Sequence, residues 1–192
     1  DRVFEGIAEG SAPGFTRGKV RDILDLGDRL LISTSDRISA FDVVLSTIPC
    51  KGEVLNGLSN HWFDCTGDII ANHIEERVSP RSVIVKKCDV LPVEVVVRGY
   101  LTGSAWRDYE AGKGVSGIQL PAGMRFNQRF DTPLLTPSTK AERGDHDEPI
   151  ASEDVVRRGL VEEKLWNQVE ETAQALFRRG SELVAERGLI LV

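Results

Sequence analysis

Leu91-Pro-Val-Glu-Val-Val-Val-Arg-Gly-Tyr-Leu-Thr-Gly-Ser104 is the stretch on which the interpretation of the fold depends. Its β-branched valines predict a mostly buried strand over residues 93–100. Two glycines then loosen the backbone, and Ser104 follows where it can cap a helix running to Ala111 or present its hydroxyl and amide to an anion. Pro92 interrupts the chain just before the strand, so we predict a boundary between two lobes there.

Two charged side chains, Glu94 and Arg98, lie within this apolar strand. An unpartnered charge in a buried strand carries a large desolvation penalty, so both groups are expected to have partners. One interpretation is an ion pair between Glu94 and Arg98 at the strand end. The other is a site for an anionic ligand, to which Arg98 and Ser104 would both contribute.

The residues before Pro92 have the pattern of an antiparallel sheet with one helix. Alternation from Val20 to Leu26, followed by a turn and a returning run from Leu30 to Thr34, predicts a hairpin. Apolar residues on one helical face predict a helix over residues 52–64 that packs on that sheet. Further strands are predicted over residues 69–76 and 82–88.

The second half of the chain has a different character. Residues 112–149 are rich in Gly, Pro, Thr and Asp, which predicts loops with short strands, and so long a loop region is usually functional. A helix is expected to open at Ser152, and a long amphipathic helix is expected to carry Leu165 to Val184. Strands followed by helices, without regular alternation, favour an α+β fold with lobes at 1–92 and 93–192.

Composition limits the classes of partner. Thirty acidic and 24 basic residues give a net charge of -6, which argues against nucleic acid and against an anionic membrane surface. No apolar run approaches a membrane span and no leader opens the sequence, so a cytoplasmic location is expected. Cys50, Cys65 and Cys88 are too few and too widely spaced to indicate a disulfide framework or a zinc site.

A glycine-containing turn, Gly14-Phe-Thr-Arg-Gly-Lys-Val20, raises the question of nucleotide binding. It is not a P-loop, because Pro13 replaces the first glycine, Val20 replaces Ser or Thr, and a strand rather than a helix follows. Such a turn between strands can instead cover phosphates with its backbone while Lys19 supplies positive charge. On the motif alone, a solvent-facing lysine in a hairpin is the simpler interpretation.

A second polar run, Ser35-Asp-Arg-Ile-Ser-Ala-Phe-Asp42, ends a predicted strand. Aspartate and serine both bond their own backbone in turns, so the run is either a capped turn or part of a site. A third, Thr136-Pro-Ser-Thr-Lys-Ala-Glu-Arg-Gly-Asp-His-Asp-Glu148, is either an ordinary charged loop or the wall of a site.

Four motifs taken together, in order along the chain, resemble the SAICAR synthetase (phosphoribosylaminoimidazole-succinocarboxamide synthase) family. They are Gly18-Lys-Val-Arg-Asp22, Ser35 to Asp42, Leu91 to Ser104, and Thr136 to Glu148. The resemblance implies a ligase that uses ATP and Mg²⁺ to join L-aspartate to the carboxylate of 5-amino-1-(5-phosphoribosyl)imidazole-4-carboxylate. It also implies an Asp-x-Lys-x-Glu-Phe-Gly segment and magnesium ligands beyond Val192, so no metal ligand is expected within this sequence.

The resemblance further implies two sets of site residues, with the nucleotide in the first lobe. The residues expected to contact ATP are Gly18, Lys19, Val85, Lys86 and Glu94. Those expected to contact the aminoimidazole ribonucleotide or aspartate are Asp36, Ser39, Arg98, Ser104, Lys140 and Asp147. Arg98 and Lys140 are the expected catalytic groups, because they would hold and screen the anionic reactants.

Two alternatives compete with this function. One is a nucleotide-binding fragment or regulatory module without turnover, to which the missing segment after Val192 lends weight. The other is a kinase-like phosphotransferase, which would need an acidic catalytic loop, and neither His-Arg-Asp nor Asp-Phe-Gly occurs in the sequence.

Overall fold

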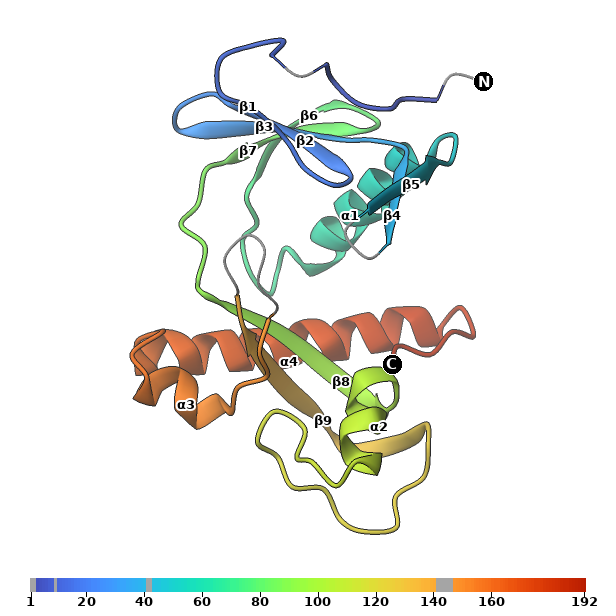
Figure 1. Ribbon diagram of the computed structural model, residues 1–192, viewed down its shortest axis with the longest axis vertical. Coiled ribbons are helices and arrows are strands. Elements are labelled where there is room, and N and C mark those ends of the chain that lie inside the picture. The colour runs from blue at the N-terminus through green and yellow to red at the C-terminus, as the bar shows by residue number, and fades with distance from the viewer. Residues whose placement is uncertain (1–2, 9, 41–42, 141–146) are drawn as a thin grey trace. The chain divides into compact units, whose positions relative to one another are not determined.

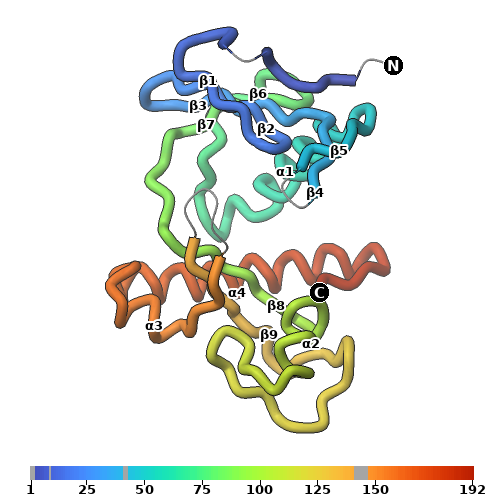
Figure 2. The backbone as a smooth tube through the Cα atoms, in the orientation of Figure 1, coloured from blue at the N-terminus to red at the C-terminus, as the bar shows by residue number. Residues whose placement is uncertain are grey.

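The structure is a computed structural model that describes residues 3–8, 10–40, 43–140 and 147–192. It divides into two compact units, Asp1–Asp89 (unit 1) and Val90–Val192 (unit 2). Figure 1 labels the elements of both units, and Figure 2 follows the path of the backbone through them. Antiparallel strands and helices that do not alternate regularly confirm the expected α+β class.

Unit 1 is built on a five-stranded antiparallel sheet with the strand order β1-β2-β3-β7-β6. Its strands are β1 (Phe15–Arg17), β2 (Arg21–Asp25), β3 (Arg29–Thr34), β6 (Ile74–Ser79) and β7 (Ser82–Lys86). The predicted hairpin is confirmed, since β2 pairs with β3 and Ile23 lies opposite Ile32. Ile32 in turn lies opposite Val83 of β7, so three branched apolar side chains share one face of the sheet.

The predicted helix in unit 1 is confirmed as α1 (Lys51–Thr66), which lies against β3. Gly52 allows this approach, because a Cβ atom there would lie 2.3 Å from the Thr34 carbonyl oxygen. A two-stranded ribbon of β4 (Arg37–Ala40) and β5 (Val43–Thr47) precedes the helix.

One strand boundary in unit 1 was predicted wrongly. The strand expected from residue 69 begins only at Ile74. The amides of Ile69 and Ile70 instead donate to the Thr66 carbonyl at the end of α1, and the Asn72 side chain accepts from the Ile74 amide. Local hydrogen bonds therefore hold this apolar pair in a turn.

Unit 2 combines a long hairpin with three helices. The hairpin consists of β8 (Val93–Leu101) and β9 (Gln128–Thr139), and the helices are α2 (Gly103–Glu110), α3 (Ser152–Arg157) and α4 (Glu163–Ala185). The helices α2, α3 and α4 confirm those expected near Ser104, at Ser152 and over Leu165 to Val184. Helix α4 crosses both strands (Figure 1), and a core forms where they meet, from Val93, Ile150, Val155, Val161 and Trp166.

Strand β9 occupies a region where mainly loops were expected. Pro133 lies where the pairing of β9 with β8 is interrupted, between the partners of Arg98 and Tyr100, and Pro137 lies opposite Val95 with its carbonyl accepting from the Ile150 amide. Proline is tolerated at such interruptions and near the edge of a sheet. Residues 189–192 follow α4 without regular secondary structure.

The strand predicted to be mostly buried forms as β8, but only one of its faces meets the core. Val93 and Val95 face the core around α4, whereas Glu94 is exposed and Val96 is 45% exposed. The valine run forms a strand whose side chains alternate between two faces, and Glu94, Val96 and Arg98 lie on the face opposite the core. Exposure removes most of the desolvation penalty that led us to expect a partner for Glu94.

Candidate functional site

The turn between β1 and β2 depends on a glycine. The Gly18 amide donates to the Arg21 carbonyl at 2.8 Å, and a Cβ atom on Gly18 would lie 2.7 Å from that same oxygen. Only glycine fits this turn without displacing its backbone. Lys19 lies at the tip and is exposed to solvent.

The polar run that begins at Ser35 holds this turn from the other side. Arg37 donates to the carbonyls of Gly18 and Lys19, each at 3.0 Å. Ser35 donates to the Val20 carbonyl through its hydroxyl at 2.8 Å and its amide at 2.9 Å. Two motifs separated by about fifteen residues are thus joined directly, which their sequence alone did not indicate.

The charge of Arg37 is neutralised inside unit 1. Its guanidinium lies 2.7 Å from the Asp22 carboxylate, and the two side chains are 3% and 0% exposed. Arg37 is therefore shielded from solvent and acts on its surroundings through protein contacts.

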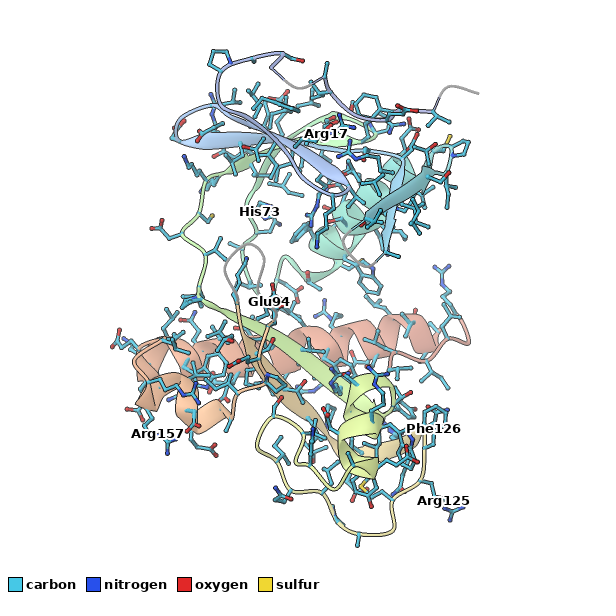
Figure 3. All side chains as sticks on the ribbon, viewed as in Figure 1. Arg17, His73, Glu94, Arg125, Phe126 and Arg157 are labelled. Carbon is cyan, nitrogen blue, oxygen red and sulfur yellow. The ribbon has the colours of Figure 1, made fainter. Side chains whose placement is uncertain are left out.

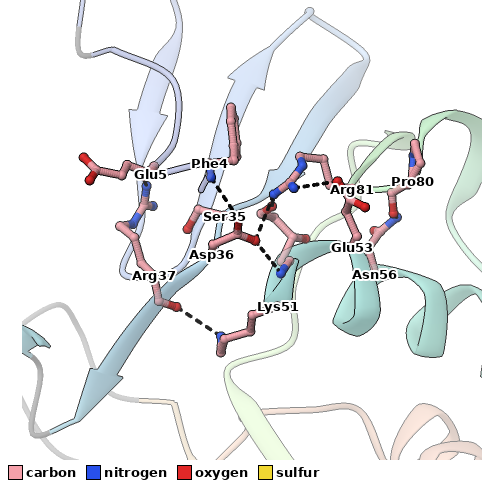
Figure 4. Close-up of polar contacts among 12 residues, drawn as sticks. Phe4, Glu5, Ser35, Asp36, Arg37, Lys51, Glu53, Asn56, Pro80 and Arg81 are labelled. Atoms are coloured by element: carbon pink, nitrogen blue, oxygen red, sulfur yellow. Dashed lines mark hydrogen bonds and ion pairs between the residues drawn. The ribbon is translucent and has the colours of Figure 1, made fainter. Parts of the chain in front are cut away.

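Asp36 lies at the centre of a second buried cluster, shown in Figure 4. One of its oxygens accepts from the Phe4 amide at 2.8 Å, and the other accepts from the Gly52 amide at 2.9 Å and from Arg81 at 3.1 Å. Burial raises the pKa of Asp36, but these hydrogen bonds outweigh burial, so the pKa lies below its usual value. The carboxylate is fully buried and offers no exposed surface to a ligand.

A cavity of about 300 Å³ lies between the sheet of unit 1 and α1. Val20, Ile32 and Val83 form its apolar wall, and the polar side chains of α1 include Asn60. Within the part of the chain that the structure describes, the buried Asn60 Oδ1 atom has no hydrogen-bond donor. A small cavity with an apolar wall and an unused acceptor suits a flat ligand that carries an N–H group. Arg21 also lines it and adds a cation that the sequence analysis did not select.

Val85 and Lys86, also predicted for the nucleotide, are not among the residues that line this cavity. Val85 is 1% exposed, and its neighbours in the sheet are Leu30 on one side and Ile74 on the other. Lys86 is exposed at the end of β7. Ser39, predicted for the substrate, lies half-buried in β4 opposite Val44.

In unit 2, the side chains of Arg98 and Ser104 are in direct contact. The Nη2 atom of Arg98 donates to the Ser104 hydroxyl at 3.1 Å, and its Nε atom donates to the Thr136 hydroxyl at 3.1 Å. Thr136, which was quoted in a motif but not selected, is 5% exposed and donates in turn to the Val96 carbonyl at 2.9 Å. No ion pair joins Glu94 (labelled in Figure 3) to Arg98 among the described residues.

Lys140 and Asp147 are exposed and lie at the two ends of the segment that follows β9. Thr139 and Glu148, their neighbours, are joined by a backbone hydrogen bond of 2.8 Å, and the Lys140 amide donates to the Pro92 carbonyl at 3.0 Å. Along the strand, Lys140 is six residues beyond the partner of Arg98, or about 20 Å. The structure therefore brings Lys140 near Asp147 but not near Arg98. Residues 141–146 lie outside the described residues.

Comparison with known proteins accounts for this combination of motifs. A sequence model of SAICAR synthetase matches residues 14–192. The chain belongs to the SAICAR synthetase family. It is 47% identical over 178 residues to the phosphoribosylaminoimidazole-succinocarboxamide synthase of Bacteroides thetaiotaomicron, a match that covers 91% of this chain and 57% of that protein. The chain thus spans little more than half the length of this relative.

Solved SAICAR synthetase structures share the fold. The SAICAR synthase from Saccharomyces cerevisiae complexed with SAICAR is 33% identical, with a TM-score of 0.84 over 96% of this chain and 67% of that one. A type-2 SAICAR synthetase in complex with ADP is 24% identical, with a TM-score of 0.76 over 93% of this chain and 71% of that one, a likeness that concerns the fold alone.

The described residues contain neither a membrane-spanning helix nor a metal-binding cluster. No helix among them is long and apolar enough to cross a membrane. Within the same residues, no group of three or more His, Cys, Asp or Glu side chains is arranged to hold a metal ion.

Proposed function

We propose that this chain carries the nucleotide- and ribonucleotide-binding parts of an ATP-dependent ligase. The reaction joins L-aspartate to the carboxylate of 5-amino-1-(5-phosphoribosyl)imidazole-4-carboxylate and releases ADP and phosphate, as a step of purine biosynthesis in the cytoplasm. The observation that carries the proposal is the family match over residues 14–192. The S. cerevisiae relative is complexed with SAICAR, which supports SAICAR as the product of the proposed reaction.

The chemistry sets requirements that the site must meet. A carboxylate is a poor acyl donor, so one of its oxygens first attacks the γ-phosphorus of ATP, and ADP leaves. The amine of aspartate then attacks the carbonyl carbon of the acyl phosphate, the bond to phosphate breaks, and the amine loses a proton. Every reactant is anionic, so positive groups must hold them together.

For the nucleotide, we propose the Gly18–Lys19 turn and the adjoining cavity, with Lys86 and Glu94 as further contacts. Lys19 would approach the phosphates, and the apolar wall at Val20 and Ile32 suits a base. Val85 would act through the sheet that it stabilises, because it is almost fully buried. Mg²⁺ would enter bound to ATP, and we assign it no ligand among the described residues.

For the second substrate, we propose that Arg98 and Ser104 bind an anionic group of the ribonucleotide. Their mutual hydrogen bond and their place on the open face of the β8–β9 hairpin support this role. Lys140 and Asp147 would contact the ribonucleotide or aspartate, and Ser39 would lie at the edge of the site. Asp36, also predicted for the substrate, would serve by stabilising the segment that holds the turn.

The test is calorimetric titration of the folded chain with MgATP and, separately, with the aminoimidazole carboxylate ribonucleotide. We expect saturable binding of both ligands. A folded chain that binds neither would contradict the proposal. Release of ADP in the presence of all three substrates would distinguish a ligase from a module that only binds.

A further inference from the structure

Three consecutive backbone carbonyls in unit 1 are held by one short segment. Arg37 binds the Gly18 and Lys19 carbonyls, and Ser35 binds the Val20 carbonyl. Ser35 is fully buried and Arg37 is 2% exposed, so water does not compete for these hydrogen bonds.

The guanidinium of Arg37 is fully used by the protein. Its five N–H groups make five hydrogen bonds, to the carbonyls of Glu5, Gly18 and Lys19 and to both oxygens of Asp22. Arg37 therefore has no donor left for a ligand, and its charge is paired. Any influence on a ligand must pass through the backbone that it holds.

That influence follows from peptide geometry. The described peptide bonds are all trans, and a trans peptide directs its carbonyl and its N–H to opposite sides. Because the Gly18 and Lys19 carbonyls point toward Arg37, the amides of Lys19 and Val20 point away from it. Successive amides that point outward from a turn form a concave site for anions. Val20 and Arg21 line the adjoining cavity, which places this turn beside the proposed site for the base.

We propose that Arg37 is a positioning residue, which orients the Lys19 and Val20 amides to bind the phosphates of the nucleotide. This inference rests on the proposed nucleotide site and adds the residue that gives the turn its binding geometry.

The experiment compares ATP with adenosine, because only ATP carries phosphates. In the Arg37→Lys variant a charge can still pair with Asp22, but one ammonium cannot span both carbonyls. We expect ATP affinity to fall at least tenfold and adenosine affinity to change less than twofold. The matched control is Arg81→Lys, an arginine that is 14% exposed and that donates to Thr34, Asp36 and Glu53 rather than to the carbonyls of the turn. Its ratio of ATP to adenosine affinity should stay as in the parent chain.

A second measurement does not depend on the folding of Arg37→Lys. In the ¹⁵N-labelled parent chain, the amide resonances of Lys19 and Val20 should shift with ADP and not with adenosine. The milder Ser35→Ala variant removes one hydroxyl bond to the Val20 carbonyl and leaves the bonds of Arg37 to the Gly18 and Lys19 carbonyls in place, so it should leave the shifts of the Lys19 and Val20 resonances unchanged.

The outcomes separate this inference from the proposed function. A parent chain that binds no ATP contradicts the nucleotide site itself. The parent chain could also bind ATP while its Lys19 and Val20 amides respond equally to ADP and adenosine. That result would contradict the role of Arg37 but not the nucleotide site. Equal losses of ATP and adenosine affinity in Arg37→Lys would also overturn that role, since they indicate general loss of structure.

Discussion

The guanidinium of Arg98 has one edge occupied by protein acceptors. Its Nε atom binds Thr136 and its Nη2 atom binds Ser104. Among the described residues, Nη1 has no acceptor, so the opposite edge of the group can receive an anion. Thr136 is itself fixed by its bond to the Val96 carbonyl, and the orientation of Arg98 is set by the strand pair.

Replacing Arg98 with lysine should therefore weaken binding of the ribonucleotide. An ammonium cannot contact Thr136, Ser104 and the ligand in one plane, so we expect the Kd to rise about tenfold or more. Calorimetry measures this, with ATP affinity as the internal reference that should not change. Thr136→Ser, which keeps the hydroxyl, should bind better than Thr136→Val, which has nearly the same shape. If Arg98→Lys is destabilised but its folded fraction binds the ribonucleotide as tightly as the parent chain, the role of Arg98 is structural.

Asp36 should make unit 1 sensitive to acid. Its pKa is lowered in the folded state, so its contribution to stability is complete above the pKa of the unfolded chain, about 4, and is lost as the pH falls through the lower folded value. Asp36→Asn should cost about 3 kcal/mol at neutral pH and flatten the dependence of stability on pH below the pKa of the unfolded chain, about 4. Urea denaturation at several pH values measures both effects.

The control for Asp36 is Asp64→Asn. Asp64 also pairs with an arginine, Arg77, but its side chain is 60% exposed. We expect almost no change in the urea midpoint at neutral pH, because solvent screens an exposed pair. Equal effects of the two substitutions would show that burial of Asp36 does not matter.

Contact between α1 and the sheet depends on the absence of a side chain at Gly52. A Cβ atom there would lie 2.3 Å from the Thr34 carbonyl oxygen and 2.9 Å from that of Ser35, and both are backbone atoms that cannot swing aside. The same residue donates its amide to Asp36. The first turn of α1 is thereby attached to the segment that supports the Gly18 turn.

Gly52→Ala should displace α1 and lower stability by roughly 2–4 kcal/mol, a size typical of severe steric conflict. Gly57, also in α1, is the matched control, because nothing lies within 4 Å of a Cβ placed there. Gly57→Ala should raise stability by about 0.5–1 kcal/mol, since alanine favours the helix. Urea denaturation of the two variants tests the contrast, and a stable Gly52→Ala chain would refute it.

The elements that could be predicted from the sequence are those with a clear period. Helices α1 and α4 and the β2–β3 hairpin follow from apolar spacing. Strand β9 was missed because Pro133 and Pro137 resemble loop residues, and only its pairing with β8 shows that Pro133 lies at an interruption of the ladder. Of the site, Arg98 and Ser104 were predicted to bind one anionic ligand, and their side chains lie within hydrogen-bond distance of each other. The roles of Asp36 and Arg37 were not predicted, because their partners lie up to 45 residues away.

The whole chain is acidic, yet its proposed ligands are anions. With a net charge of -6, general attraction cannot hold ATP, so individual cations must do so. Lys19→Ala should weaken ATP binding about tenfold without altering the urea midpoint, because Lys19 is exposed at the tip of its turn. Lys113→Ala, which removes an exposed lysine from unit 2, is the control. If both variants lower ATP affinity equally, net charge rather than position explains the effect.

The hydrogen bonds that hold the Gly18 carbonyl and its two successors also affect the thermodynamics of binding. Ordering the backbone of one residue costs about 1–2 kcal/mol in conformational entropy. In this protein, that ordering is part of folding, because Ser35 and Arg37 fix the turn through buried contacts. A phosphate that binds there would meet a preorganised loop, and its association should carry only a small entropic penalty from the backbone.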